Sequence, residues 1–437
     1  MISIFSHKNS KRLQYILKLI FQELMGVDFE IITSAEDFAA KKGIKLQYTP
    51  SRIENGLFIC SKDLIFETDI RHQDIQFVEF QGTNCPFSIH TQESIMPFDI
   101  FAASFYLISR YEEYLPHKKD GHKRFIAKES LAFQKNFLHK PVINIWALAL
   151  IDKIKEHYPH FSVEQKPYKY IASYDIDIAW SYRNKGITRN IGGSIRDLMQ
   201  LNTKAFITRW KVLAGKMKDP YDTYELQMKW QKQYNLQPIY FILFGDLGPF
   251  DKNISTSNQK FQSLIKDLRD IALIGIHPSY ESNLNKKLLK KEIDKLSETV
   301  HADIIRSRQH FLKLNLPSTY RNLLNLGIKH DYSMGYASEL GFRASIASSF
   351  FFYDLDLDTE TKLQIHPFAI MDGSLRDYLK VDPKTAKQMI SNIISEIKQV
   401  NGQMISLWHN ESLSGVDKWQ GWVEVYKHLL KEAQESD

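Results

Sequence analysis

Two carboxylates separated by one residue, Asp175 and Asp177, follow an apolar run that is typical of a β-strand. In a strand, residues i and i+2 point to the same side, so both acids converge on one small volume at the end of the strand. Two like charges this close are unfavourable unless a cation or a shared proton compensates them. The pair therefore suits one carboxylate as a metal ligand and the other as a general base. A solvated Asp-x-Asp turn after an ordinary strand is the alternative.

A second apolar run leads directly into His277, and Glu281 follows four residues later. If a helical turn follows the histidine, the two side chains share one face. Together with Asp177 they offer nitrogen and oxygen ligands of the kind that bind zinc or a similar divalent ion. A histidine held by hydrogen bonds within a local turn is the competing interpretation.

Two further stretches add cationic groups and histidines. The segment 306–312 sets Arg308 close to His310. An arginine beside a catalytic carboxylate keeps that carboxylate ionised and oriented, and His310 is interpreted as either a metal ligand or a structural residue. The apolar run 404–408 leads into His409, and a histidine can protonate a leaving group at neutral pH. Strand ends that carry Asp-x-Asp, His and His are a combination that a random globular sequence would rarely give.

The chain has 437 residues, more than one hydrophobic core usually serves, so we expect two domains. Its content of 43% hydrophobic and 25% charged residues is that of an ordinary globular protein. The formal net charge of +6 is interpreted as spread along the chain, with lysine clusters such as 286–291 typical of a solvated helix face. No nucleic-acid partner is expected.

The N-terminus lacks a basic segment followed by an apolar one, and no apolar run approaches the roughly 18 to 20 residues that span a bilayer. Two cysteines, Cys60 and Cys85, give neither a disulfide framework nor a cysteine zinc site. We therefore expect a soluble, cytoplasmic protein without a membrane span. The oligomeric state is left open.

Hydrophobic periodicity predicts a mixed α/β segment over residues 1–165. Its expected strands are 2–5, 29–33, 45–48, 56–60, 64–67 and 76–80, and its expected helices are 11–25, 99–114 and 142–158. A cluster of charged residues in this segment forms either a site or, as we favour, a structural ion-pair network: Arg110, Glu112, Glu113, His122 and Arg124.

Strands and helices alternate over residues 166–437. One expected strand ends near Asp175, and the others are 239–244, 273–276 and 404–408. The expected helices are 224–234, 259–270, 286–299, 319–326 and 384–400. Such alternation favours parallel strands with crossover helices, in an open sheet or a barrel, and chemistry then collects at the carboxyl ends of the strands. The segment 330–344, dense in Gly, Tyr and polar residues, either shapes a substrate groove or is an irregular connection.

These stretches resemble the motifs of the polysaccharide deacetylases, the family 4 carbohydrate esterases. Tyr174-Asp-Ile-Asp177 is similar to the first family motif, which implies Asp175 as the general base and Asp177 as a metal ligand. Gly275-Ile-His-Pro-Ser-Tyr-Glu281 resembles the second motif at His277, but it has Glu281 where the family has a second histidine. The resemblance implies that Glu281 or His310 completes the metal site.

The remaining motifs extend the resemblance. Arg308 resembles the third-motif arginine that orients the base, and Leu407-Trp-His409 resembles the fifth motif, which implies His409 as the general acid. The family fold implies a distorted (β/α) barrel over 166–437, preceded by a smaller α/β domain of unknown role at 1–165. The implied cofactor is a divalent metal, zinc above all. Aromatic side chains that would offer apolar faces to a sugar, or serve in packing, are Tyr280, Tyr336 and Trp408.

The whole chain also resembles a two-domain, Bacteroidetes-type branch of deacetylase-like proteins, through the Phe98–Phe125 pattern and the His-Pro-Ser-Tyr, Arg-Gln-His and Trp-His-Asn strings. The implied function is metal-dependent removal of N- or O-linked acetyl groups from a carbohydrate or glycan precursor. One alternative is a non-catalytic relative that binds a glycan or a protein partner. Another is a metal-dependent hydrolase of a different C–N bond, such as that of a cyclic amide.

Overall fold

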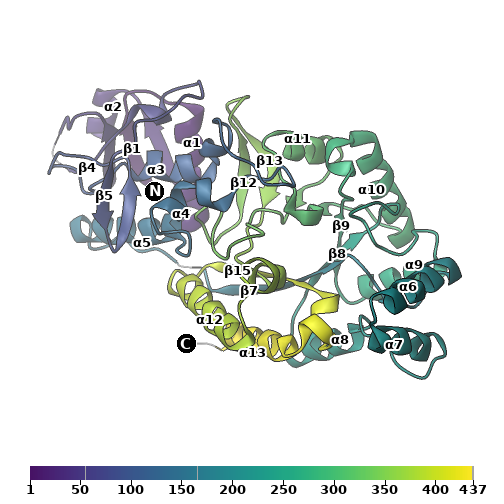
Figure 1. The fold of residues 1–437 in the computed structure, drawn as a ribbon. Coiled ribbons are helices and arrows are strands. Elements are labelled where there is room, and N and C mark those ends of the chain that lie inside the picture. The colour runs from purple at the N-terminus through teal and green to yellow at the C-terminus, as the bar shows by residue number, and fades with distance from the viewer. Residues whose placement is uncertain (55, 165, 436–437) are drawn as a thin grey trace.

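Two large β-sheets, one in each half of the chain, organise the computed structural model, which describes residues 1–54, 56–164 and 166–435 (Figure 1). The first sheet is parallel, with the spatial order β2 (Phe29–Ile32), β1 (Ile2–Ser6), β3 (Ile44–Thr49) and β4 (Leu57–Cys60). An antiparallel pair follows, β5 (Phe77–Phe80) with β6 (Thr83–Pro86). The α-helices of this half are α1 (Lys11–Leu17), α2 (Ala35–Ala40), α3 (Ile100–Ile108), α4 (Leu131–Gln134) and α5 (Val142–His157).

The second sheet is parallel except for its β12–β13 pair. Its spatial order is β12 (Phe350–Asp354), β13 (Thr359–Ile365), β11 (His330–Asp331), β10 (Arg306–Ser307), β9 (Leu273–His277), β8 (Ile239–Leu243), β7 (Lys169–Ile176), β15 (Gln403–His409) and β14 (Ile370–Met371). Its α-helices are α6 (Ile187–Met199), α7 (Thr203–Leu213), α8 (Tyr224–Gln233), α9 (Gln259–Arg269), α10 (Lys286–Val300), α11 (Ser318–Asn325), α12 (Pro383–Gln399) and α13 (Trp422–Gln434).

The pairing order of the second sheet is open, with β12 and β14 at its two edges. The sheet nevertheless curves, because the backbone N–H of Phe368, shortly before β14, donates to the carbonyl of Met334, shortly after β11, at 3.2 Å. The mixed α/β class predicted from the sequence is therefore confirmed. Strand pairing within the described residues does not close a barrel, so the closed form stays a prediction.

Most predicted elements are present, and the strand predicted at 64–67 is wrong. Residues Asp63–Ile65 form a 3-10 helix instead. The carbonyl of Asp63 accepts hydrogen bonds from the N–H groups of Phe66 at 2.7 Å and Glu67 at 3.1 Å, so the segment bonds to itself rather than to a neighbouring strand. A short apolar run does not distinguish these two outcomes. None of the described helices combines the length and the hydropathy needed to cross a bilayer.

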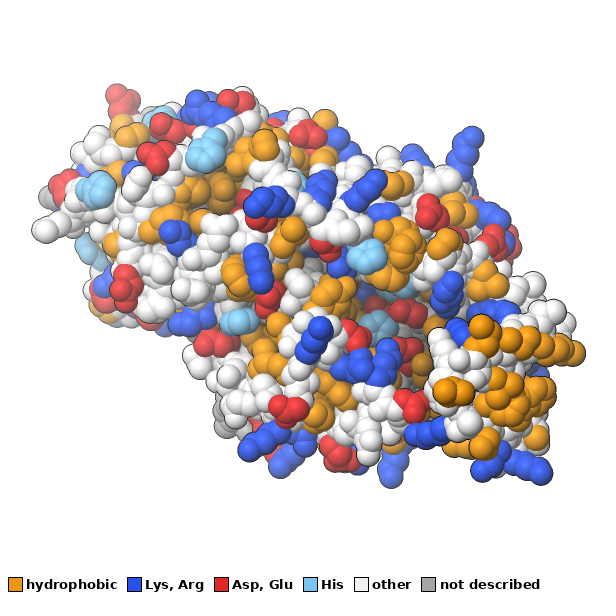
Figure 2. All heavy atoms as spheres, in the orientation of Figure 1, with side chains coloured by type: hydrophobic (Ala, Val, Ile, Leu, Met, Phe, Trp, Pro, Cys, Tyr) orange, Lys and Arg blue, Asp and Glu red, His pale blue; other side chains and the backbone are white. Residues whose placement is uncertain are grey.

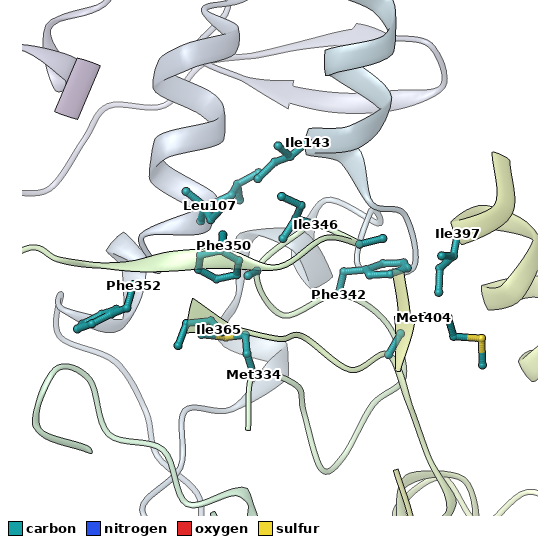
Figure 3. Packing of buried hydrophobic residues seen from close by; sticks show 14 of the residues in the cluster. Leu107, Ile143, Met334, Phe342, Ile346, Phe350, Phe352, Ile365, Ile397 and Met404 are labelled. Carbon is teal, nitrogen blue, oxygen red and sulfur yellow. The ribbon is translucent and has the colours of Figure 1, made fainter. Parts of the chain in front are cut away.

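Buried hydrophobic residues from both halves form one continuous core. Figure 3 shows Leu107 of α3 and Ile143 of α5 close to Phe342 and Phe350 of the second half. The backbone also joins the halves, because the N–H of Phe342 donates to the carbonyl of Leu138 at 2.8 Å. In Figure 1 the first half lies beside β12 and β13. The first half therefore buttresses one edge of the larger sheet.

The division into domains at 1–165 and 166–437 stays a prediction. The boundary itself falls at Gln165, which lies outside the described residues. The continuous core implies that the two halves depend on each other for stability.

A buried ion-pair network confirms the structural interpretation of Arg110, Glu112 and Glu113, but not of Arg124, which lines a cavity. Glu113 accepts hydrogen bonds from Arg110 Nε at 2.8 Å and from Arg343 Nη2 at 2.6 Å. Arg110 also donates to the hydroxyl of Tyr336 at 3.0 Å, and all four side chains are buried. Burial raises the pKa of Glu113, but Arg343 and Arg110 outweigh this effect and lower the pKa from 4.5 to about 2. The network joins the two halves through charged groups.

We expect Glu113→Gln to destabilise the protein by about 3 kcal/mol at pH 7, because Arg343 loses its buried counter-charge and Arg110 keeps only Glu112. The pKa of this carboxyl is depressed in the folded protein, so its stabilisation is present above pH 4.5 and is lost as the pH falls toward 2. Urea unfolding at a series of pH values measures the difference. Glu156→Gln, in an exposed pair with Lys153, is the control and changes stability by about 0.5 kcal/mol or less. Equal effects of the two variants would contradict the account.

Candidate metal centre

The carboxyl ends of neighbouring parallel strands place the predicted site residues side by side. The register of β15 against β7 sets His409 opposite Asp175, and Asp177 follows β7 directly. Strand β9 ends at His277, two strands away, and Arg308 follows β10 beside it. Since parallel strands present their carboxyl ends at the same edge, these side chains meet there, as is usual for sites in parallel α/β folds.

The side chains of Asp177, His277 and His310 form a group of candidate metal ligands. Their ligand atoms all lie within 4.8 Å of one another. His277 Nε2 is 3.2 Å from Asp177 Oδ1, and His310 Nε2 is 3.5 Å from Asp177 Oδ2. Both histidines are buried, and Asp177 is half-buried at the floor of a cavity. Two nitrogens and one carboxylate form a ligand set typical of catalytic zinc, which keeps a further position open.

One oxygen of Asp177 indicates that this group fits a cation. Oδ1 is buried and accepts no hydrogen bond, even though His277 Nε2 lies 3.2 Å away. A buried carboxylate oxygen without a donor is costly, and a divalent ion held between the carboxylate and the imidazole nitrogens would remove that cost.

Both imidazoles are oriented as metal-binding histidines usually are. His277 Nδ1 lies 2.6 Å from the carbonyl oxygen of Arg308, and His310 Nδ1 lies 2.8 Å from Asp251 Oδ1. Because these oxygens can only accept, each Nδ1 carries the proton and donates it. When each ring is neutral, its Nε2 lone pair is directed at Asp177, and outer partners of this kind fix the ligand tautomer.

The charges of the cluster favour a cation beside Asp177. Burial raises the pKa of Asp177, but His310, His277 and His409 outweigh burial and hold it well below its ordinary value. Burial lowers the pKa of His310, whereas Asp177 and Asp251 raise it to about 9. Asp177 is therefore ionised at neutral pH, and positive charge must lie next to it, carried either by an imidazolium or by a metal ion.

Asp175 is held by an arginine rather than by the metal ligands. Arg308 is fully buried, and its Nη1 donates to Asp175 Oδ1 at 2.9 Å. The other donors of the guanidinium are occupied by Ser173 Oγ at 2.8 Å and by the carbonyl of Tyr332 at 3.0 Å. Asp175 Oδ2 lies 3.7 Å from His277 Nε2, on the side of the candidate metal ligands. This geometry suits a general base.

His409 has a carboxylate partner that the sequence analysis did not identify. Its backbone N–H and its Nδ1 each bond to Asp372, both at 2.8 Å, and Ser412 Oγ donates to the same carboxylate. Its Nε2 lies 3.7 Å from Asp177 Oδ2. Burial lowers the pKa of His409, but Asp372, Asp177 and Asp175 raise it well above its ordinary value. A protonated His409 that points Nε2 into the site can act as a general acid.

We expect Asp372→Asn to shift the alkaline limb of the pH profile of kcat/KM to lower pH. The limb falls where the general acid loses its proton, and the variant removes the charge that contributes most to raising the pKa of His409. The measurement is hydrolysis rate against pH for both proteins. Asp377→Asn, which changes a carboxylate that also lines the cavity, is the control and leaves the limb in place. An unmoved limb in Asp372→Asn would contradict the role of His409.

The candidate ligands open into a cavity of about 290 Å³. Aromatic residues on its wall come from one loop and three short helical turns, and not from the predicted set: Phe250, Phe311, Tyr378 and Trp419. Arg124 from the first half also lines the cavity, and it donates to the carbonyl of Phe311 at 2.7 Å and to the Tyr378 hydroxyl at 3.1 Å. The first half of the chain therefore contributes directly to the wall of the site.

The structure does not bring the three predicted sugar-binding aromatics to the cavity wall. Trp408 is fully buried and packs on Tyr426 of α13, because alternation along β15 sends it to the face opposite His409. Tyr336 is buried in the Arg110 network. Tyr280 stacks on Phe250 with ring centroids 4.2 Å apart, so it supports a wall residue from behind.

Glu281 also lies outside the group of candidate ligands and is exposed. Its predicted approach to His277 required a helical turn, yet the following 3-10 helix begins only at Ser282. The intervening N–H of Ser279 bonds to Glu292 at 3.1 Å, so the chain leaves β9 in an irregular turn. Of the two alternatives for the third ligand, the structure brings His310 to Asp177 and His277.

Comparisons with known proteins gave one family model, which covers the first half of the chain, and several distant solved structures. A protein-family model described as "Family of unknown function (DUF7033)" matches residues 2–159. A search of curated proteins found no match. The solved structures that match include a Mycobacterium smegmatis protein assigned to the polysaccharide deacetylases, with 11% identity and a TM-score of 0.40 over 62% of this chain and 85% of that chain.

Two further solved structures match at comparably low identity. A polysaccharide deacetylase from Bacillus cereus shows 11% identity and a TM-score of 0.29, over 61% of this chain and 86% of that chain. A mutant of a family 4 carbohydrate esterase pseudoenzyme with restored enzymatic activity shows 9% identity and a TM-score of 0.25, over 63% and 70% of the respective chains. Similarity this distant assigns no activity, so the function of this chain must be inferred from its own side chains.

Proposed function

We propose that the protein is a metal-dependent hydrolase that removes N- or O-linked acetyl groups from a carbohydrate or glycan precursor. The observation that carries the proposal is the convergence of three arrangements on one cavity. These are the Asp177, His277 and His310 ligand group, the arginine-held Asp175 and the carboxylate-held His409. Together they supply the parts that hydrolysis of an amide or ester requires.

Asp177, His277 and His310 would hold the metal, and their donor set favours zinc. A bound divalent ion supplies Lewis acidity that polarises a carbonyl group and lowers the pKa of water. Asp175 accepts the proton of the attacking water through Oδ2, while Arg308 holds Oδ1 of the same carboxylate in place. His409 donates its Nε2 proton to the leaving nitrogen or oxygen, and the products are acetate and a free amine or alcohol.

The carbohydrate part of the proposal rests on the motif resemblance and on the aromatic wall of the cavity. Apolar faces such as those of Phe250, Tyr378 and Trp419 suit the C–H face of a sugar ring. Glu281 in place of a second histidine favoured a non-catalytic relative. Against it, His310 Nε2 lies 3.5 Å from Asp177 Oδ2 and could supply a third ligand.

The test is an acetate-release assay on N-acetylated and O-acetylated sugars, with zinc, cobalt or nickel supplied, and with cyclic amides included in the panel. We expect acetate from at least one sugar class, and loss of that activity in the Asp177→Ala, His277→Ala double variant. If only a cyclic amide were hydrolysed, the protein would be a hydrolase of that C–N bond and not a deacetylase. Equal activity in the double variant would overturn the metal-dependent mechanism.

A further inference from the structure

The helical hairpin α6–α7 presents its apolar side to solvent. Apolar residues of α6 recur at intervals of three or four positions and therefore share one face. They are between 48% and 81% exposed, and comprise Ile187, Ile191, Ile195, Leu198 and Met199. Leu201 in the connection is 86% exposed and Trp210 of α7 is 45% exposed. Figure 2 shows hydrophobic side chains gathered at the lower right, over α6 and α7.

The buried side of the same hairpin is largely polar, with Val212 of α7 as its buried apolar residue. Asn190, Ser194 and Asp197 of α6 are buried, and Asp197 pairs with the buried Arg209 of α7 at 2.7 Å. At Gly193 an added Cβ would lie 2.6 Å from Arg209 Nη1, so glycine permits the close approach of this guanidinium. A surface helix of a soluble protein normally buries its apolar stripe and exposes its polar one. The α6–α7 hairpin is inverted, and a buried ion pair holds it in that orientation.

Positive charge is concentrated on this hairpin. Residues 187–218 contain seven basic residues and one acidic residue, a net charge of +6 that equals the net charge of the whole chain. The expectation of a charge spread along the chain is therefore wrong. The exposed members are Arg196, Lys204, Lys211, Lys216 and Lys218. Lys204 and Lys218 have carboxylates within ion-pair distance, Asp417 at 3.1 Å and Glu225 at 2.5 Å, and exposed pairs of this kind are weak.

We propose that the α6–α7 hairpin docks the protein onto an anionic membrane surface. An apolar helix face bordered by Lys and Arg enters the boundary between headgroups and acyl chains, where anionic phosphates balance the cations. Trp210 suits the same interface. A second copy of the chain is a poorer occupant, since a two-fold interface would oppose one +6 hairpin to another.

Docking in this way would hold the cavity near the membrane. Arg189 of α6 donates to the carbonyls of Asn253 at 2.9 Å and Lys252 at 3.0 Å, and Lys252 lines the cavity. Lys204 pairs with Asp417, two residues before the cavity residue Trp419. The hairpin is thus joined to two loops of the cavity wall. The membrane proposal stands on the hairpin alone and does not depend on the proposed catalytic activity.

The test is co-sedimentation of the full chain with vesicles of equimolar phosphatidylglycerol and phosphatidylcholine, and with vesicles of phosphatidylcholine alone. We expect binding to the anionic vesicles, at least about tenfold weaker binding to the neutral ones, and loss of binding at high salt. The variant Leu198→Ser, Leu201→Ser, Trp210→Ser removes apolar contacts, and Lys211→Gln, Lys216→Gln removes charge. Each should lower binding to anionic vesicles about tenfold or more.

Matched controls lie elsewhere on the surface. Leu284→Ser, Leu357→Ser changes leucines that are 65% and 61% exposed, and Lys155→Gln, Lys384→Gln removes two exposed lysines. Both controls should bind like the wild type. Absence of binding to anionic vesicles would overturn the proposal, as would equal losses in the control variants. A stable dimer that the apolar hairpin variant dissociates, measured by sedimentation velocity, would assign the surface to a second copy instead. Thermal unfolding confirms that each variant is folded.

Discussion

Asp175→Asn lowers the rate of acetate release by about 10²–10⁴-fold, the range that a general base contributes, while the metal content stays that of the wild type. The amide still offers an oxygen to Arg308 Nη1, so the arrangement seen at 2.9 Å is kept. The amide side chain, however, cannot accept a proton from water at neutral pH. Steady-state rates on the best substrate, together with elemental analysis of the same preparation, measure both quantities.

A matched control separates the loss of the Asp175 base from a disturbance of the Arg308 contacts that position it. Ser173→Ala removes only one partner of the Arg308 guanidinium, which keeps its bond to Asp175, and we expect a far smaller loss of rate. If Asp175→Asn kept more than a tenth of the wild-type rate, the assignment of Asp175 as the base would be wrong.

His310→Ala weakens zinc binding by at least about 100-fold, whereas Glu281→Ala leaves it unchanged. The first variant removes a nitrogen that lies 3.5 Å from Asp177 Oδ2, and losses of 10–100-fold already follow from changes to the partners of metal ligands. The second changes an exposed side chain outside the candidate ligand group. Calorimetric titration of the metal-free proteins with zinc measures both affinities.

The outer partner of His310 provides a graded comparison. Asp251→Asn keeps the size of the residue that accepts from Nδ1 at 2.8 Å, and it should weaken zinc binding by about 10–100-fold. The opposite order, in which Glu281→Ala loses the metal and His310→Ala retains it, would show that the chain rearranges around the ion and that His310 is structural.

Much of the site could be predicted from the sequence because strand ends are recognisable. Asp175, His277 and His409 each follow an apolar run, and parallel strands with crossovers present such ends at one edge. The choice between Glu281 and His310 could not be made in the same way. It depends on the pairing of β9 with β10 and on the irregular turn after His277, neither of which leaves a periodic signal.

The partners Asp251 and Asp372 escaped prediction for a related reason. Asp251 lies in the loop after β8, and Asp372 follows the two-residue strand β14, so neither adjoins a long apolar run. Their roles arise only from tertiary contacts with His310 and His409. Trp408 was predictable from its position. If His409 points into the site, strand alternation places its neighbour on the opposite face.

Several helices with a regular apolar stripe were predicted, but α13, which also buries such a stripe, was missed. Helices such as α5 and α10 bury an apolar stripe, and the sequence indicated both. The α6–α7 hairpin, with its exposed apolar face, was not predicted at all. The joining of the two halves through Arg110, Glu113 and Arg343 was also beyond the sequence, because Arg343 lies 230 residues after Glu113.

The metal content of the purified protein tests the central claim most directly. The account predicts about one equivalent of zinc or a similar divalent ion per chain, retained on dialysis and lost in the Asp177→Ala, His277→Ala double variant. It predicts the same stoichiometry when the metal-free protein is incubated with zinc. A wild-type protein that binds no zinc, cobalt or nickel under these conditions would contradict the account and leave the cluster as a structural network of ionised side chains.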